Sequence, residues 1–341
     1  MTNANSDPRR RSIFVVLLLW GVALSYGFAD WGIYRAGILL HGDQWRMYLH
    51  GGIQAPFQYR IGSWVIVDGL QRAFHMRPYD TLTLIDVVCL VVALWLLLRL
   101  PANGNGLEER LPPRKFLLAL AVLFFAEYYL TWGHWFQSPE TLPSILFVTV
   151  SMVLVYGDIV SNRTLACILL IAFSGLQGFF RADVAVVLHG GFFLTIVLNR
   201  KISAPLGRAR QAIVSLVAAV AAGCVQLYLM FVRFPHARYG PEGAIQIVAN
   251  FRPGMWLTML LTFFPYFVFL GLLIGKRIRL DGPQTMLLVA SVLYLALWAI
   301  AGQLDETRIF LPFAFALIPA TAAAWAGFLS EKDFDPGASA T

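Results

Sequence analysis

The segment Ala29–Arg60 reads ADWGIYRAGILLHGDQWRMYLHGGIQAPFQYR and directly follows the first long apolar segment. It is the longest polar interruption in a sequence otherwise made of apolar segments. Such segments are expected to form membrane-spanning helices, which leave few places for polar chemistry. We therefore predict that the helices form a scaffold. The segment after Ala29 would be the working face, on the side of the membrane opposite to the N-terminus.

The composition indicates a polytopic membrane protein. The chain has 341 residues, of which 58% are hydrophobic and 13% are charged, more apolar surface than a soluble protein can bury. The apolar segments are long and continuous, unlike the alternating strands of an outer-membrane barrel. Cys89, Cys167 and Cys224 lie inside these segments and are expected to be apolar residues, not disulfides or metal ligands. The basic residues are spread over short loops, so the net charge of +7 does not indicate a nucleic-acid partner.

The apolar segments predict an all-α bundle of about ten transmembrane helices. Residues 12–328 would form a single transmembrane domain between a cytoplasmic N-terminus (1–11) and a cytoplasmic tail (329–341). The expected spans are 12–29, 80–98, 116–132, 141–158, 164–180, 182–199, 212–233, 255–275, 284–302 and 309–328.

The basic residues predict the orientation. Most of them lie in short loops on the side of the N-terminus, which places both termini in the cytoplasm and the protein in the inner (plasma) membrane. Residues 61–76 are short for a span and contain Asp68 and Arg72. If they crossed, the later basic loops would face outward, so we predict a helix lying at the outer surface. Residues 30–79 then form one outer loop with short helices around 42–51 and 61–76.

Asp30 is the first candidate for a catalytic residue. It is expected to end the first span with its carboxylate facing the water side, where it could act as a general base toward an acceptor hydroxyl. Tyr34 would share its helix face if the helix continues. Asp43, in the same loop, is the alternative base. The competing interpretation of Asp30 is a helix cap beside an aromatic belt.

The predicted outer side also collects candidate substrate-binding residues. Arginine suits bidentate phosphate binding, whereas mutual ion pairing at helix ends is the competing interpretation. No metal site is predicted, because His75, His134 and His236 lack ligand spacing. The chain contains no P-loop, GxSxG or HExxH motif. The candidates are Tyr34, Arg35, Arg60, Glu140, Arg181, Asp183, Glu306 and Arg308.

The chain resembles the GT-C class of integral membrane glycosyltransferases, in particular those that use polyprenyl-phosphate-mannose. The resemblance lies in DWGIYRAGILLHG (30–42), in PFQYR (56–60), in ETR (306–308) followed by Pro312, and in the order of one span, a long outer loop and a bundle. It implies an inverting transfer of a sugar from a polyprenyl-phosphate donor to a lipid, glycan or protein acceptor on the outer face. It also implies Asp30 as the base, and Arg60, Arg181 and Arg308 are the candidates for the lipid phosphate. No cofactor is expected, and a role for a divalent cation stays open.

Two further functions stay open. A secondary transporter or lipid flippase would prefer charge at mid-membrane, and Asp86 within the second predicted span favours it. The concentration of charge on one side of the membrane favours the enzyme. A non-catalytic scaffold subunit of an envelope-assembly complex would keep the fold and tolerate loss of Asp30. Membrane lipids are partners in all three cases.

Overall fold

The computed structural model describes residues 8–332 except 101–112, 134–137, 157–159, 161, 239–244, 246, 249, 251, 276–277, 279 and 305. Most of the predicted N-terminal segment 1–11 and of the tail 329–341 therefore lies outside the described residues. Every described element is a helix, which confirms the all-α prediction. In chain order they are α1 (Pro8–His41), η1 (Gly42–Arg46), α2 (Met47–His50), η2 (Phe57–Tyr59), α3 (Gly62–Phe74), α4 (Pro78–Arg99), α5 (Pro113–Gly133), α6 (Thr141–Tyr156), α7 (Arg163–Leu198), α8 (Arg208–Tyr228), η3 (Leu229–Arg233), α9 (Pro253–Thr262), α10 (Phe264–Ile274), α11 (Gly282–Ala301), η5 (Thr307–Ile309), α12 (Leu311–Ala316) and α13 (Ile318–Lys332).

Several helices are long and apolar enough to cross a membrane. There are six in the described part of the chain, or seven if the bent pair α9–α10 forms one span. The prediction of about ten spans is not confirmed. The predicted span 141–158 is a helix of 16 residues, and the last predicted span is divided among η5, α12 and α13. The span predicted over 255–275 is bent by 80° between α9 and α10.

α1 continues to His41, so the prediction that the first helix ends near Asp30 was wrong. Residues 31–41 contain no proline to interrupt the helix. Gly42, with φ +60°, begins the short helix η1. Asp30 and Tyr34 consequently lie on one face of a continuous helix, one turn apart.

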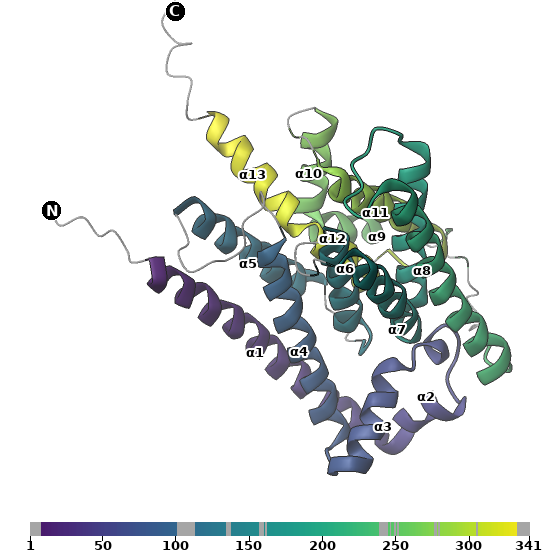
Figure 1. The fold of residues 1–341 in the computed structure, drawn as a ribbon. Coiled ribbons are helices and arrows are strands. Elements are labelled where there is room, and N and C mark those ends of the chain that lie inside the picture. The colour runs from purple at the N-terminus through teal and green to yellow at the C-terminus, as the bar shows by residue number, and fades with distance from the viewer. Residues whose placement is uncertain are drawn as a thin grey trace, which may run out of the picture.

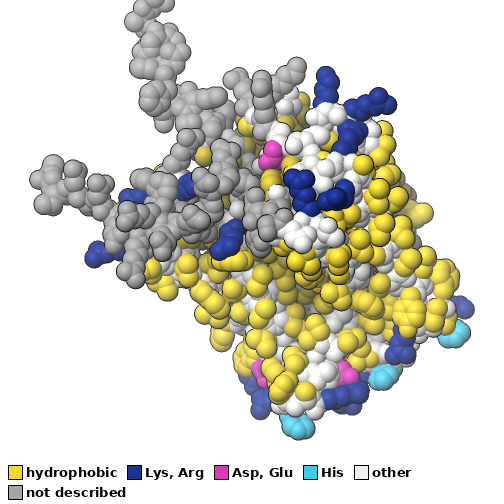
Figure 2. Space-filling model, in the orientation of Figure 1, with side chains coloured by type: hydrophobic (Ala, Val, Ile, Leu, Met, Phe, Trp, Pro, Cys, Tyr) yellow, Lys and Arg dark blue, Asp and Glu magenta, His cyan; other side chains and the backbone are white. Residues whose placement is uncertain are grey.

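The short helix predicted around 42–51 is present as η1 and α2, and that predicted around 61–76 as α3. The short helix η2 between them was not predicted, and we call residues 42–74 the platform. α3 has 13 residues and is about 20 Å long, too short to cross a bilayer. The platform lies at the end of the molecule opposite to the first residues of α1 and the last helical residues of α13 (Figure 1). On the face in Figure 2, apolar side chains form a broad band between basic groups at the two ends.

α7 folds back on itself at Arg181, where the backbone leaves the helical region at φ −147° and ψ 80°. Its first arm follows α8 in parallel, because the Ser174 hydroxyl donates to the Ala218 carbonyl. Its second arm runs the other way, since Arg208 at the start of α8 donates to the carbonyls of Ile196 and Asn199. The predicted break between helices 164–180 and 182–199 is therefore present.

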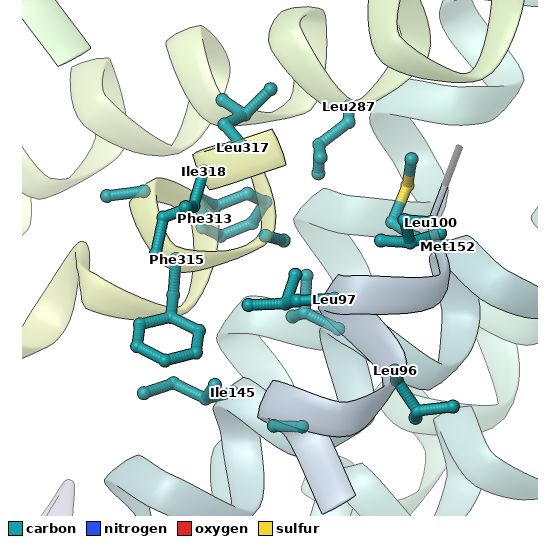
Figure 3. Packing of buried hydrophobic residues seen from close by; sticks show 14 of the residues in the cluster. Leu96, Leu97, Leu100, Ile145, Met152, Leu287, Phe313, Phe315, Leu317 and Ile318 are labelled. Carbon is teal, nitrogen blue, oxygen red and sulfur yellow. The ribbon is translucent and has the colours of Figure 1, made fainter. Parts of the chain in front are cut away.

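The centre of the bundle is apolar. Every residue of α12 is buried, and α12 packs chiefly against α6 and also against α5. Figure 3 shows Leu97 of α4, Ile145 of α6 and Phe315 of α12 gathered in this core. Because α12 directly follows η5, this packing fixes the position of Arg308.

Candidate functional site

Charged side chains from distant segments meet at the platform end of the bundle. The Arg60 guanidinium, which follows η2, forms an ion pair with Glu140 at 2.8 Å, just before α6. Glu140 is 5% exposed. Next to this pair, the Ser63 hydroxyl donates to the Pro139 carbonyl. The platform is thus joined to the beginning of α6 by two polar contacts.

Glu140 lies among three arginines. Burial alone would raise the pKa of its carboxyl group. The positive charges of Arg60, Arg308 and Arg181 and a hydrogen bond from Ser138 outweigh burial and lower this pKa below its ordinary value. The three arginines proposed for phosphate binding are therefore close enough to act on one carboxylate.

Arg181 is held by two partners. Its Nε and one terminal nitrogen donate to the two oxygens of Asp183, at 3.1 and 2.6 Å, and the same terminal nitrogen lies 2.5 Å from the Tyr294 hydroxyl. Tyr294 also donates to Asp183. The Arg181 side chain is 1% exposed, whereas that of Asp183 is 38% exposed. This arrangement stabilises the tight turn of α7, as the ion-pairing interpretation of these residues expects.

Arg308 is bound less completely. One terminal nitrogen lies 3.3 Å from Glu306, and its buried Nε has no hydrogen-bond partner among the described residues. Burial lowers the pKa of the Arg308 guanidinium, although Glu140 and Glu306 act in the opposite direction. The guanidinium still stays charged at neutral pH. A buried N–H group without a partner costs free energy, and this makes the Arg308 Nε a candidate donor to an acceptor.

Arg60 and Arg308 lie against the same aromatic ring. Their guanidinium carbons are 5.4 and 5.9 Å from the centroid of Phe57. The main chain around both is fixed: the Gln58 side chain binds the backbone at Tyr48 and Ile53, and the Thr307 hydroxyl donates to the Gly133 carbonyl. We call this set the arginine cluster: Arg60, Glu140, Arg181, Asp183, Glu306 and Arg308.

A second polar group lies between α1 and α4. The Tyr34 hydroxyl donates to Asp86 at 2.7 Å, and Asp30 is near enough to act electrostatically on both side chains. Asp30 is 1% and Asp86 2% exposed. The expectation that the Asp30 carboxylate faces water was therefore wrong, because the prolonged α1 turns this residue toward α4. Asp30, Tyr34 and Asp86 form the carboxyl cluster, and Glu140 is near enough to act electrostatically on Tyr34 and Asp86.

Two sequence candidates lie apart from these groups or cannot be placed. Arg35 is exposed, and its guanidinium carbon lies 5.0 Å from the centroid of the Trp31 ring. Asp43 belongs to η1, but its side chain lies outside the described residues. Sequence reasoning missed Tyr294 and Phe57 and treated Asp86 as a structural residue or a transport signal. The available signal was the ionisable Asp86 within an apolar segment.

Charge is balanced within the arginine cluster, because each arginine has one acidic partner: Glu140, Asp183 or Glu306. An incoming phosphate must therefore compete with these carboxylates, and Arg308 has the weakest existing contact. In the described ranges, no three His, Cys, Asp or Glu side chains are arranged to hold a metal ion. Comparison with protein-family models, with curated proteins and with solved structures finds no match to this chain.

Proposed function

We propose that the protein is a membrane glycosyltransferase of the GT-C type. It would transfer a sugar from a polyprenyl-phosphate donor to a lipid, glycan or protein acceptor on the outer face of the inner membrane, with both termini cytoplasmic. The observation that carries this proposal is the meeting of Arg60, Arg181 and Arg308 around Glu140, beside the carboxyl cluster. A lipid phosphate needs cationic donors next to apolar surface, and a transfer reaction needs an acid–base group nearby.

The arginine cluster would bind the donor phosphate. Arg308 is the main ligand in this proposal, because its Nε has no partner in the described structure and its contact with Glu306 is 3.3 Å long. Arg60 would assist after loosening from Glu140. Arg181 would act through its charge, since Asp183 and Tyr294 already occupy its side chain. Positive charge here stabilises the leaving polyprenyl phosphate.

The carboxyl cluster would supply the base. Asp30 takes the proton of an acceptor hydroxyl, the acceptor oxygen forms a bond to the anomeric carbon, and the bond from that carbon to the phosphate oxygen breaks. The electron pair leaves with the polyprenyl phosphate, and the anomeric configuration inverts. Asp86 and Tyr34 hold Asp30 in place. Because Asp30 is buried, the acceptor would have to displace side chains packed over it, and catalytic contacts commonly tighten only in the substrate complex.

The test follows radiolabelled sugar from polyprenyl phosphate into acceptors in membranes that contain the wild-type protein, Asp30→Asn or Asp43→Asn. Loss of a general base lowers the rate by about 10²–10⁴-fold. Asp30→Asn should insert and bind donor but transfer almost no label, and Asp43→Asn should lose less. Normal transfer by Asp30→Asn would contradict the assignment. An inactive Asp43→Asn beside an active Asp30→Asn would move the role to Asp43.

A secondary transporter is the second candidate, and a specific contact favours it. Asp30 and Asp86 are both buried and lie near each other on two candidate membrane spans, α1 and α4, and neighbouring carboxyl groups inside a membrane are typical of proton-coupled carriers. The two functions differ in product. Sugar joined covalently to an acceptor supports the enzyme, whereas movement of intact donor across proteoliposomes supports the carrier. If neither transfer nor movement of the donor is detected, the scaffold interpretation is supported.

A further inference from the structure

A separate polar pocket lies on the platform. It has a volume of about 310 Å³ and is lined by Arg46, His50, Asp68, Gln71 and Arg72. These side chains come from η1, α2 and α3, and none of them belongs to the arginine cluster or the carboxyl cluster. Pockets of this size hold small ligands or the polar part of larger ones.

The lining favours an anion. Arg46 and Arg72 are positively charged, and His50 and Gln71 add hydrogen-bond donors. The one carboxylate of the lining, Asp68, already forms an ion pair with Arg72 at 2.8 Å. Arg72 can move to meet a ligand, because its side chain is 76% exposed. Two arginines against one paired carboxylate leave a net positive pocket, which suits a phosphate.

Exposed apolar residues lie beside the charged ones on the same helix. Val65 is on the face of α3 that carries Arg72, two turns away, and Val65 and Ile66 are 51% and 38% exposed. Beneath the surface of the platform, Trp45 and Tyr48 stack on the buried Trp64, with ring centroids 6.0 and 4.8 Å away, so η1, α2 and α3 are held together. A helix that exposes apolar residues next to basic ones suits a segment lying in the membrane interface.

We propose that this pocket binds the phosphate of an anionic phospholipid headgroup, in the leaflet that the platform contacts. The exposed Val65 and Ile66 of α3 would lie among the acyl chains while Arg46 and Arg72 hold the phosphate. This site is independent of the proposed glycosyl transfer and would fix the platform, and with it Arg60, at a constant depth.

The test measures retained lipid. Full-length protein is placed in nanodiscs of phosphatidylcholine with a minor share of phosphatidylglycerol, and bound phosphatidylglycerol is counted by native mass spectrometry after extraction. Each basic residue at an anionic surface strengthens binding about fivefold, so the double variant Arg46→Gln/Arg72→Gln should bind phosphatidylglycerol about 25-fold more weakly. His50→Gln keeps both arginines and should weaken binding by a smaller factor. It is the variant to use if the double variant folds poorly.

The matched control removes two exposed positive charges elsewhere, in Arg238→Gln/Arg252→Gln. It should retain phosphatidylglycerol like the wild type. Wild-type retention by Arg46→Gln/Arg72→Gln, or equal loss in the control, would overturn the proposal. Inorganic phosphate is the second probe: phosphate that binds lipid-free protein, with no phosphatidylglycerol retained from the nanodiscs, would show a site for free phosphate instead of lipid.

Discussion

At the scale of single residues, Glu140 is the group in the site whose replacement should cost the most stability. It is buried and paired with Arg60, so replacing it by glutamine leaves a buried guanidinium without its carboxylate. Breaking a buried pair in this way costs about 3–5 kcal/mol. Glu140→Gln should lower the unfolding temperature markedly in detergent. Glu306→Gln is the control. The contact between Glu306 and Arg308 is longer, at 3.3 Å, and Glu306 is partly exposed, so this substitution should cost about 0–1 kcal/mol.

The same carboxylate predicts a dependence of stability on pH. Burial opposes ionisation of Glu140, but the neighbouring arginines lower its pKa below the ordinary value of 4.5 in the folded protein. The unfolded chain binds the proton first as the pH falls, so the stabilisation is complete above pH 4.5 and is lost as the pH falls from 4.5 through the lowered pKa. Unfolding measured from pH 6 to pH 3 should show a smaller loss in Glu140→Gln than in the wild type. Equal slopes would contradict the pairing.

For Arg308 we expect a large effect on donor binding and a smaller effect on stability than for Glu140. Removal of Arg308 takes away a buried Nε–H group that has no partner in the described structure but also one of the positive charges around Glu140, so Arg308→Gln should cost less stability than Glu140→Gln. Loss of a charge-paired phosphate ligand should weaken donor binding by about 30-fold or more. Binding of polyprenyl phosphate to purified protein measures this. Arg35→Gln, exposed and outside the cluster, serves as control and should bind normally.

At the scale of elements, the contact between α7 and α11 depends on one glycine. A Cβ atom at Gly191 would lie 2.6 Å from both Cα and Cβ of Ala290, so Gly191→Ala must push the helices apart. Overpacking of this kind costs about 1–3 kcal/mol. Gly190, its neighbour, has open space at the same position, and Gly190→Ala should be neutral or slightly stabilising. Thermal unfolding of the two variants compares them directly, and equal unfolding temperatures would refute the close approach.

The elements also show where sequence reasoning succeeds and fails. The break at Arg181 was located from the sequence, because Arg181 and Asp183 interrupt a long apolar segment, and the two residues pair where the helix arms meet. The sequence did not reveal that α1 continues beyond Asp30. In a sequence, a charged residue inside a helix looks the same as one at the end of a membrane span. The bend before Pro265 was also missed. A proline can lie in the first turn of a new helix or can kink a continuous one. The sequence alone does not distinguish these cases, and in this protein Pro265 lies in the first turn of α10.

At the scale of the whole molecule, the meeting of Arg60, Arg181 and Arg308 was predictable in part. Charged side chains are costly inside an apolar bundle, so they are expected at its ends. The sequence therefore predicted that these three arginines lie on the same side of the membrane. Their one-to-one pairing with Glu140, Asp183 and Glu306 was not predictable, because it depends on side-chain geometry from four separate segments. The contact of Asp86 with Tyr34 likewise required the packing of α1 on α4.

The last prediction concerns which end of the molecule faces outward. Arg233, at the end of η3, donates to the Leu49 carbonyl on the platform, so the end of the α8–η3 helix lies there. The 26 residues from Arg208 to Arg233 span about 39 Å, which places the basic loop 199–207 at the opposite end. The two basic residues of this loop, Arg200 and Lys201, favour the cytoplasm. The platform should therefore face outward.

Single cysteines at Arg77 and Lys201, both exposed, test this orientation in a background in which the three native cysteines are replaced by serine. A membrane-impermeant thiol reagent applied to intact spheroplasts should label Arg77→Cys and spare Lys201→Cys, and both should react once the membrane is permeabilised. The outward placement fails if Lys201→Cys alone reacts in intact cells. If both react there, the two ends of α8 lie on one side, and the helix does not cross the membrane at all.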